Sequence, residues 1–216
     1  MSQHCHRIGH GGASALAPAN SLAAFDAALE VGVDMVEFDV RGWRGQLVLA
    51  HTAFDAGRGA SLPLRTALAH LATRRFREVE LNLDLKHHGC ESALLDTLDR
   101  AAVLGRALVS SQLPGVIDAV RAQEPRARVA ISVGGRFSRW SRRWGDWRAY
   151  VLGGLQRRRW DAIMAQHRLV DERLVSDVTG GGGALYAWTV NDRSSVEQLR
   201  LLGVHGIVTS DPRLLN

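Results

Sequence analysis

Two acidic side chains stand two residues apart in the apolar run Val36–Val40, and they are the first sign of chemistry in this sequence. Glu37 and Asp39 alternate with apolar residues as in a β-strand, so both carboxylates lie on one face of it. Neighbouring negative charges are unfavourable unless a positive charge lies between them. A divalent cation with oxygen ligands meets this need, and Asp84 is a candidate third ligand. A pair of solvated strand-end acids is the alternative.

Lys86 is the only lysine among the 27 basic residues of the chain. An ammonium group is a compact point charge, whereas the guanidinium group of arginine is a wide planar fork. Lys86 follows Asp84 by two residues at the end of the alternating run Leu81–Leu85, so the two side chains share one face. We therefore interpret Lys86 as a functional cation, with an ordinary strand-end lysine as the alternative.

Two histidines follow strand-like runs in the same part of the chain. His10 ends the first run, and His51 ends the run after the acidic pair. Histidines beside a metal can serve as general base and general acid near neutral pH. A lone histidine is more often structural, and the chain has 9 histidines, so the interpretation depends on both of them together with the acids and Lys86. Gln166 and His167 end a later run and are weaker candidates.

These side chains need a scaffold, and short β-type runs alternate with helical patterns along nearly the whole chain. The strand candidates are Arg7–Gly11, Met35–Val40, Gln46–His51, Glu78–Lys86, Ala107–Gln112, Arg128–Val133, Ala162–His167, Ala184–Val190 and Gly206–Thr209. The helix candidates are Ser21–Val31 with Asn20 as its N-cap, Leu64–Thr73, Ser92–Leu104, Val116–Gln123, Glu172–Val178 and Ser194–Leu202.

This alternation predicts an α/β protein with a mostly parallel sheet and helices outside it. Eight or nine strands favour a closed (β/α)8 TIM barrel, and 216 residues fit a single compact domain over 1–216 with short loops. In such a barrel the carboxyl ends of the strands form the active face. His10, Glu37, Asp39, His51, Asp84 and Lys86 are all expected at that face.

At these positions the chain resembles the glycerophosphodiester phosphodiesterase family, a TIM-barrel group of metal-dependent phosphodiesterases. Gly9–Ser14 and Leu16–Phe25 follow the spacing of its H-R-G and P-E-N-T signature. Val36–Val40 looks like its E-x-D strand, and Leu47–His51 looks like its H-D strand. Leu83–Lys86 matches its E-x-K element with aspartate for glutamate, and Ala187–Asn191 and Gly203–Thr209 look like its W-T-V-N and G-V-D-G-I-I-T segments.

The resemblance implies one divalent metal ion, Mg²⁺ or Ca²⁺, on Glu37, Asp39 and Asp84. It also implies acid–base catalysis by His10 and His51, with Lys86 and Trp188 binding the substrate. The expected enzyme is a phosphoric diester hydrolase of lipid metabolism. It would act on a glycerophosphodiester or a lysophospholipid-like diester, releasing an alcohol and a phosphomonoester.

The chain departs from the family pattern at three motif positions. Gly11 replaces an arginine, Ala19 replaces a glutamate, and Thr52 replaces an aspartate. Losing the arginine and the glutamate together suggests that the two are partners in the family. Whether Arg7, Arg41 or another arginine takes over is left open. The segment Thr52–Ser61 is also shorter than the usual family insert, which predicts a more open mouth.

Two other functions remain as alternatives. The sphingomyelinase D-type phospholipases share the two histidines, the E-x-D pair and a D-x-K element, and Asp84 agrees with them better. Such an enzyme is a phospholipase D-like lyase that forms a cyclic phosphate by internal attack. The second alternative is a degenerate barrel that serves as a non-catalytic binding protein, suggested by Gly11, Ala19 and Thr52.

Residues 136–160 hold four of the six tryptophans, together with many arginines. Trp140, Trp144, Trp147, Val151 and Leu155 recur at helical spacing. A basic helix with an aromatic stripe can make a peripheral contact with an anionic membrane. Packing of the stripe against the barrel is the equally weighted alternative. Nucleic-acid binding is not expected.

Composition limits the remaining choices. A formal charge of +5 suits an anionic substrate, and two cysteines are too few for a disulfide framework. The first residues lack the apolar core of a secretion signal, and no apolar stretch approaches the length of a membrane span. We therefore expect a cytoplasmic protein, peripheral at the membrane if residues 136–160 bind lipid.

Overall fold

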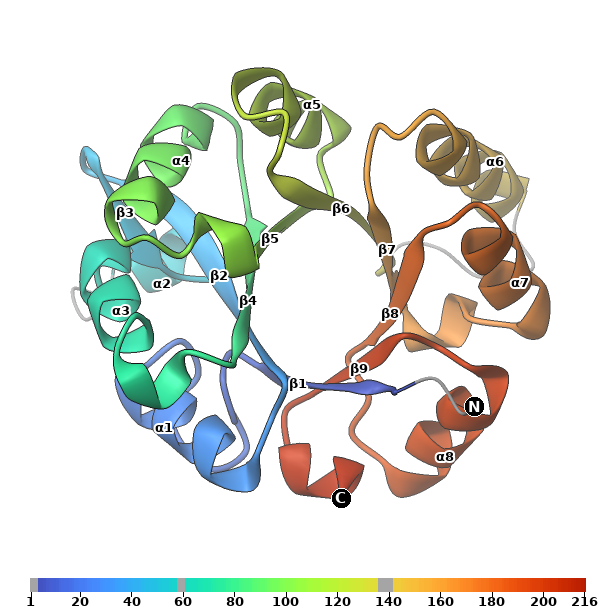
Figure 1. Cartoon of the computed structure of the whole chain (residues 1–216), viewed down its shortest axis with the longest axis horizontal. Coiled ribbons are helices and arrows are strands. Elements are labelled where there is room, and N and C mark those ends of the chain that lie inside the picture. Colours follow the sequence, from blue (N-terminus) through green and yellow to red (C-terminus); the bar gives the residue numbers. More distant parts are fainter. Residues whose placement is uncertain (1–3, 58–60, 136–141) are drawn as a thin grey trace.

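The computed structural model describes residues 4–57, 61–135 and 142–216, and it has the predicted TIM-barrel architecture. Parallel strands form a closed ring because β1 pairs with both β2 and β9 (Figure 1). The barrel strands are β1 (His6–His10), β2 (Met35–Trp43), β4 (Glu80–Leu85), β5 (Ala107–Ser111), β6 (Arg128–Val133), β7 (Ala162–Gln166), β8 (Ala184–Trp188) and β9 (Gly206–Thr209).

Helices surround this ring and cover the outward faces of the strands (Figure 1). They are α1 (Leu22–Val31), α3 (Leu64–Leu71), α4 (Glu91–Arg100), α5 (Pro114–Gln123), α6 (Arg142–Gln156), α7 (Glu172–Gly180) and α8 (Arg193–Leu202). Their apolar faces pack on residues such as Val36, Phe38 and Leu83 to form the main core. The helix-period pattern in the sequence is thus explained by burial against the sheet.

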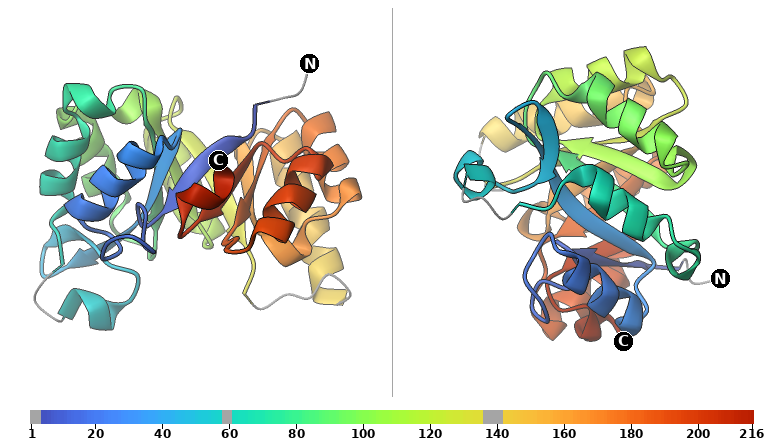
Figure 2. Two further views of the ribbon diagram at one scale, coloured as in Figure 1. Left: turned by 90° about the horizontal axis from the view of Figure 1, so that it is seen from below. Right: turned by 90° about the vertical axis from the view of Figure 1, so that its left-hand side faces the viewer.

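The strand expected at Gln46–His51 is not part of the ring. It forms β3 (Gln46–Leu49), which pairs antiparallel with the far end of β2 across a turn at Arg44 and Gly45. Both turn residues have positive φ, which suits a tight hairpin. The hairpin leads to the short helix α2 (Ala53–Gly57), which projects from the same end of the barrel as the start of α6 (Figure 2).

The inside of the barrel has an apolar floor and a polar upper layer. Ile8, Met35, Met164, Tyr186 and Val208 belong to a separate buried cluster of inward-facing residues. Along β2, the inward positions after Met35 are Glu37 and Asp39, because side chains alternate across a strand. The ionisable residues therefore lie above an apolar plug, near the carboxyl ends of the strands.

The start of α1 differs from the prediction in one residue. Ser21 is the N-cap, and its side chain accepts a hydrogen bond from the amide of Ala24. Asn20, the predicted cap, has φ of 59° and is turned toward the barrel, where it contacts Asp39. A serine and an asparagine are both good caps, so the sequence alone does not separate them.

The arginine–tryptophan stretch packs on the barrel as far as the structure describes it. Residues 136–141, including Trp140, lie outside the described residues. Trp144 and Trp160 are 4% and 1% exposed, and Val151 and Leu155 are also buried. Trp144, Val151 and Leu155 of the stripe are therefore core, and Trp147 is partly buried against it, which gives no support to membrane contact. No helix among the described residues is both long enough and apolar enough to cross a membrane.

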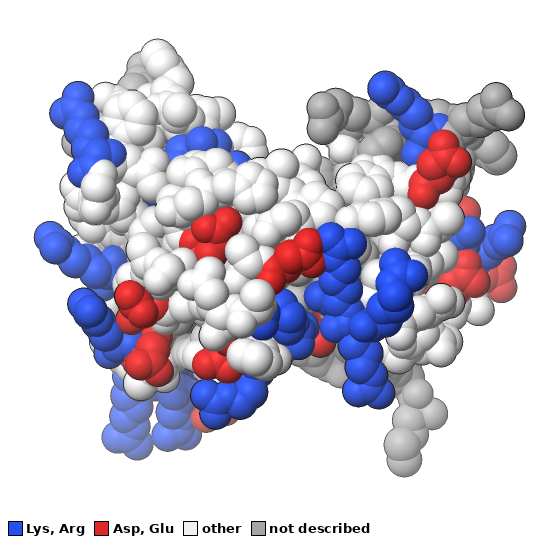
Figure 3. All heavy atoms as spheres, turned by 90° about the horizontal axis from the view of Figure 1, so that it is seen from above, with Lys and Arg blue, Asp and Glu red and all other residues white. Residues whose placement is uncertain are grey.

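Some arginines of the outer face are paired with acids. On the side that carries α4, α5 and α6, basic and acidic side chains are interspersed (Figure 3). Arg121 lies 2.6 Å from Asp161, and Arg126 lies 3.1 Å from Glu124. Because these charges are neutralised locally, the positive excess of the chain does not form one uniform basic surface here.

Candidate active site

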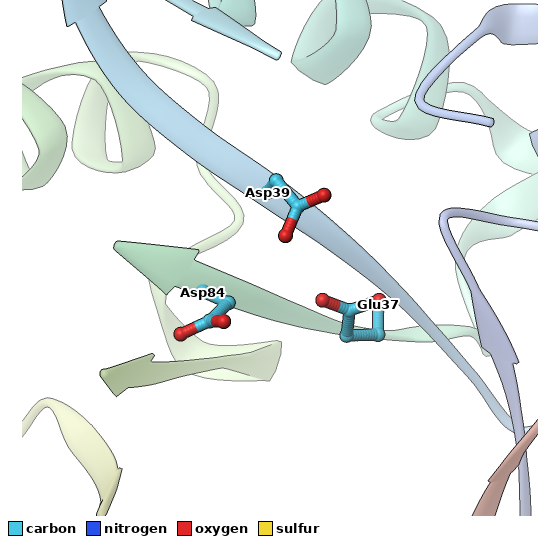
Figure 4. A group of neighbouring side chains, drawn as sticks. All are labelled: Glu37, Asp39 and Asp84. Atoms are coloured by element: carbon cyan, nitrogen blue, oxygen red, sulfur yellow. The ribbon is translucent and has the colours of Figure 1, made fainter. Parts of the chain in front are cut away.

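Three carboxylates meet on the inner side of β2 and β4. Glu37 and Asp39 come from β2 and Asp84 from β4 (Figure 4), and one oxygen of each lies within 4.8 Å of the others. All three residues are at most 9% exposed. The two strands are hydrogen-bonded neighbours with Asp39 directly opposite Asp84, so strand register brings together residues 45 positions apart. An all-oxygen set of this kind suits a hard divalent cation.

Lys86 lies between two of these carboxylates. Its Nζ is 2.6 Å from Oδ1 of Asp39 and also contacts Oδ2 of Asp84. Burial by itself would lower the pKa of Lys86, but the charges of Asp84 and Asp39 outweigh burial and raise it. The amine is therefore a permanent cation at neutral pH. Its side chain is only 14% exposed, which is unlike an ordinary solvated lysine.

The pKa values of the three acids are shifted in different directions. Burial raises the pKa of Glu37 well above its usual range, and the nearby charge of Asp39 adds to this effect. Burial also raises the pKa of Asp84, although Lys86 opposes it. For Asp39, burial is outweighed by the hydrogen bond from His51 and the charge of Lys86, so its pKa falls. A bound divalent cation would favour the ionised form of all three acids.

The two histidines flank the carboxylates at different depths. The Nε2 of His10, at the end of β1, is 4.0 Å from Oε2 of Glu37, and its side chain is 38% exposed. The Nδ1 of His51 donates to Oδ1 of Asp39 at 3.2 Å, and its side chain is 65% exposed. Burial lowers the pKa of His10, whereas the hydrogen bond to Asp39 raises the pKa of His51.

The hairpin and α2 explain how His51 reaches the mouth. The antiparallel return of β3 carries the chain back alongside β2, where the amide of Ala50 donates to the carbonyl of Asp39 at 3.2 Å. Beyond His51, Thr52 and Asp55 cap α2 through reciprocal bonds. Thr52, which replaces the aspartate of the family motif, therefore has a local structural role as a helix cap.

The loop after β1 supports the acids from the other side. The amide of Gly11 donates to Oε2 of Glu37 at 3.1 Å. Asn20 bonds Asp39 twice: its Nδ2 donates to Oδ2 at 3.0 Å, and its Oδ1 accepts from the backbone amide at 3.1 Å. Asn20 is thus a site residue that the sequence interpretation missed, because an asparagine before a helix is indistinguishable from an ordinary cap.

Gly11 and Ala19, which stand where the family motif has an arginine and a glutamate, are adjacent in space. A Cβ placed on Gly11 would lie 3.0 Å from the Cβ of Ala19, and the carbonyl of Gly11 accepts from the amide of Asn20. An arginine at 11 and a glutamate at 19 would therefore meet. This geometry is compatible with the hypothesis that the two residues are partners in the family.

Arg7 and Arg41 were left open as replacements for the missing arginine, and both side chains are engaged in other contacts. Arg7 forms a two-pronged contact with Asp34 near the start of β1, which is the opposite end of the strand from His10. Arg41 donates from Nη2 to the carbonyl of His51 at 3.2 Å. Arg41 therefore holds the backbone next to His51.

The three carboxylates, Lys86 and the two histidines line one cavity of about 250 Å³. It is lined by His10, Glu37, Asp39, His51, Asn82, Asp84, Lys86, Ser110, Gln112, Ser132, Met164, Trp188, Thr189 and Val208. Trp188 donates its indole N–H to the carbonyl of Met164 at 2.9 Å, so it presents its ring and not a donor. Gln166 and His167 do not line the cavity, and Gln166 instead accepts from the amide of Gly135.

Several polar lining residues were not anticipated from the sequence. Asn82, Ser110, Ser132 and Thr189 lie inside or beside strand runs. The alternation places Asn82 on the face of Asp84 and Lys86, but nothing in the local pattern marks the residues of the different strands as facing the same space. The signal that could have identified them is a polar residue at an inward position of a barrel strand. That signal requires the strand phase to be known for each strand separately.

A family model matches the segments of the chain that carry these residues. The model of the glycerophosphoryl diester phosphodiesterase family matches residues 10–52 and 83–214, which include every candidate residue named for the acids, the histidines and Lys86. The Bacillus subtilis protein YhdW, provisionally assigned as a glycerophosphodiester phosphodiesterase, is 25% identical over 95% of this chain and 94% of its own length.

Solved structures share the fold over nearly the whole chain. A structure from Silicibacter pomeroyi superposes with a TM-score of 0.84 at 19% identity, covering 99% of this chain and 92% of the other. An Oleispira antarctica phosphodiesterase, solved with the product sn-glycerol-3-phosphate, gives a TM-score of 0.76 at 21% identity, covering 95% and 93%. The extended match to the family model then assigns the chain: it belongs to the glycerophosphoryl diester phosphodiesterase family of hydrolases.

Proposed function

We propose that this protein is a divalent-cation-dependent hydrolase of glycerophosphodiesters that releases an alcohol and a phosphomonoester. The observation that carries the proposal is one cavity that gathers three buried carboxylates, Lys86 and two histidines at the carboxyl end of the barrel. Perturbed ionisable groups that converge in a cleft are typical of catalytic sites. Membership of the family supports the same reaction class.

Glu37, Asp39 and Asp84 are the residues that would hold the cation, and their oxygen donors fit Mg²⁺ or Ca²⁺. A bound cation of this type supplies polarisation of a phosphoryl oxygen and neutralises part of the diester charge. Lys86 has the position and the permanent charge to contact another phosphate oxygen. In that position Lys86 stabilises the negative charge that accumulates as the phosphoryl group is transferred.

The two histidines divide the proton transfers by their positions. His10 is the less exposed and lies beside Glu37, so it accepts the proton of the attacking water. His51 is at the solvent side and donates its proton to the departing alkoxide, which leaves toward the mouth. The oxygen of water bonds to phosphorus as the bond to the alcohol breaks. The pKa directions of the two rings agree with this division.

The cavity volume favours a small diester as the first substrate class. About 250 Å³ is just below the roughly 300 Å³ at which small-molecule sites usually begin. The Oleispira antarctica neighbour binds sn-glycerol-3-phosphate, which supports a glycerol phosphate moiety here as well. Lysophospholipid-like diesters are the second class, since Leu16, Phe54 and Leu113 are exposed apolar side chains in the segments that follow β1, β3 and β5.

Formation of a cyclic phosphate is a second candidate reaction, and Asp84 is the observation that favours it. An aspartate at this position agrees with the D-x-K element of the sphingomyelinase D-type enzymes. In that reaction a hydroxyl of the substrate itself attacks phosphorus, and no water is consumed. Phosphorus NMR separates the two, because hydrolysis gives a monoester and internal attack gives a cyclic diester.

The test is a product-resolved assay over glycerophosphodiesters and lysophospholipids, with EDTA and with Mg²⁺ or Ca²⁺ restored. We expect a phosphomonoester only with cation. His10→Ala and His51→Ala should each lower turnover by roughly 100- to 10,000-fold. His70→Ala is the matched control, because His70 pairs with Asp26 outside the barrel. Full turnover in EDTA, or in both site variants, would contradict the proposal.

A further inference from the structure

Asn82 completes a square of inward side chains with the three candidate ligands. β2 and β4 pair in parallel register, with Glu37 opposite Asn82 and Asp39 opposite Asp84. Neighbouring strands lie about 4.8 Å apart, and inward positions recur every second residue. Three corners of the square are carboxylates. The fourth corner is the amide of Asn82, which also lines the cavity and is fully buried.

The orientation of this amide is determined by its neighbours on β5. Its Nδ2 donates to the carbonyl of Leu108 at 3.0 Å and to Oγ of Ser110 at 2.9 Å. The reversed amide would place two acceptor oxygens against each other at Leu108, which is unfavourable. The carbonyl oxygen of Asn82 therefore faces away from β5, on the side of the cavity and the acids.

That oxygen finds no hydrogen-bond partner among the described residues. A buried polar atom left without a partner costs about 1–3 kcal/mol, so such atoms are rare in stable proteins. The neighbouring side chain in register, Glu37, is itself an oxygen acceptor when ionised. The oxygens of Asn82 and ionised Glu37 can both be satisfied only by a group that is positive or that carries hydrogens.

We propose that Oδ1 of Asn82 is the fourth oxygen donor of the cation site. Three carboxylates and one neutral amide oxygen form an all-oxygen set, which is the chemistry that hard divalent cations select. The inference rests on the proposed cation-dependent function, but it concerns binding of the cation and not turnover. Ser110 then becomes a supporting residue, because it holds Nδ2 of Asn82 and lies 3.5 Å from Oδ1 of Asp84.

The test measures cation binding by calorimetry on the full-length protein, with Mg²⁺ or Ca²⁺ as the probe and without substrate. Asn82→Leu keeps the size of the side chain and removes the oxygen. We expect its dissociation constant for the cation to rise roughly 10- to 100-fold, the usual effect of losing one supporting group at a metal site. Ser132→Ala, a buried cavity residue on β6, is the matched control and should bind as the parent protein does.

A second variant separates binding from folding. Asn82→Asp retains an oxygen but adds a fourth acid and loses the donor to Leu108. Its melting temperature in EDTA should therefore fall, and added cation should raise it by more than in the parent. The cation-induced shift should decrease from Asn82→Asp to the parent and then to Asn82→Leu. Equal cation affinity of Asn82→Leu and the parent would overturn this inference alone, whereas a parent that binds no cation would overturn the proposed function too.

Discussion

The cavity has two unlike walls. The wall formed by β1, β2, β4 and the segment after β3 contributes two histidines, three carboxylates and Lys86. Among the described residues that line the opposite wall, from β5 to β9, none is ionisable: Ser110, Gln112, Ser132, Met164, Trp188, Thr189 and Val208. Both walls are built on parallel barrel strands, and the first wall also has the β3 hairpin, which brings in His51. The remaining difference comes from the side chains at and just beyond the inward positions of the strands.

This asymmetry suits a substrate that is itself two-sided. A phosphodiester carries its charge at phosphorus and its apolar atoms in the alcohols. The ionisable wall concentrates electrostatic stabilisation, which is worth most in a partly buried site. The opposite wall offers a ring face and small hydroxyls, which fix orientation. If this division is correct, changes on the first wall alter turnover, and changes on the second alter substrate binding.

Among the substitutions that test this division beyond the two histidine variants, Lys86→Arg should give the largest effect. The variant keeps the charge, but a planar guanidinium is too wide for the place between Asp39 and Asp84. We expect kcat to fall by about 100-fold, comparable to the loss of one transition-state donor elsewhere. Steady-state kinetics measure this fall, and the melting temperature shows whether folding is intact. Full activity in a folded Lys86→Arg protein would instead support the alternative interpretation, in which Lys86 is an ordinary strand-end lysine.

Trp188→Phe should produce a smaller effect of a different kind. The change shortens the aromatic wall and removes the hydrogen bond to the carbonyl of Met164. We expect KM to rise roughly five- to tenfold, because one such contact is worth about 1 kcal/mol. Cation affinity should stay as in the parent protein, since Trp188 lies on the other wall. A Trp188→Phe protein that lost cation binding would show that the two walls cannot be treated separately.

Most residues of the ionisable wall could be predicted from the sequence, because the patterns that mark them are local. A strand with alternating polarity places Glu37 with Asp39, and Asp84 with Lys86, on one face whatever the rest of the fold does. The βα alternation then predicted the closed barrel, and a barrel brings successive strand ends together. Those two steps were enough to bring five of the six side chains to one space, whereas His51 reaches it from the β2–β3 hairpin and not from a barrel strand.

The parts that were missed depend on long-range register. β3 has the same period as a barrel strand, so its antiparallel pairing shows only in the turn at Arg44 and Gly45. Asn20 resembles a helix cap, although it bonds Asp39. Asn82 looks like one more polar residue in an alternating run until β4 is aligned with β2 and β5. None of these contacts is encoded within a single short segment.

The smallest expected effect comes from changing Gly11 and Ala19. These two adjacent residues lie at the edge of the ionisable wall and lack the charges of the family pattern. Gly11→Arg alone adds a cation next to Ala19 on a backbone with φ of 59°, where a side chain costs about 1 kcal/mol or more. Ala19→Glu alone adds an unpaired acid beside the carboxylates. In the double variant the new arginine and glutamate would form an ion pair. Its positive member would lie near Glu37, whose Oε2 accepts a hydrogen bond from the amide of residue 11.

We therefore expect the double variant Gly11→Arg with Ala19→Glu to raise turnover by roughly two- to tenfold, and by more than the two single effects combined, because residues in contact are coupled by about 0.5–3 kcal/mol. A double-mutant cycle of kcat/KM and melting temperature measures this coupling. Additive or null effects would mean that positions 11 and 19 are neighbours without being partners. The ionisable wall would then be complete as it stands, with Lys86 as its permanent cation.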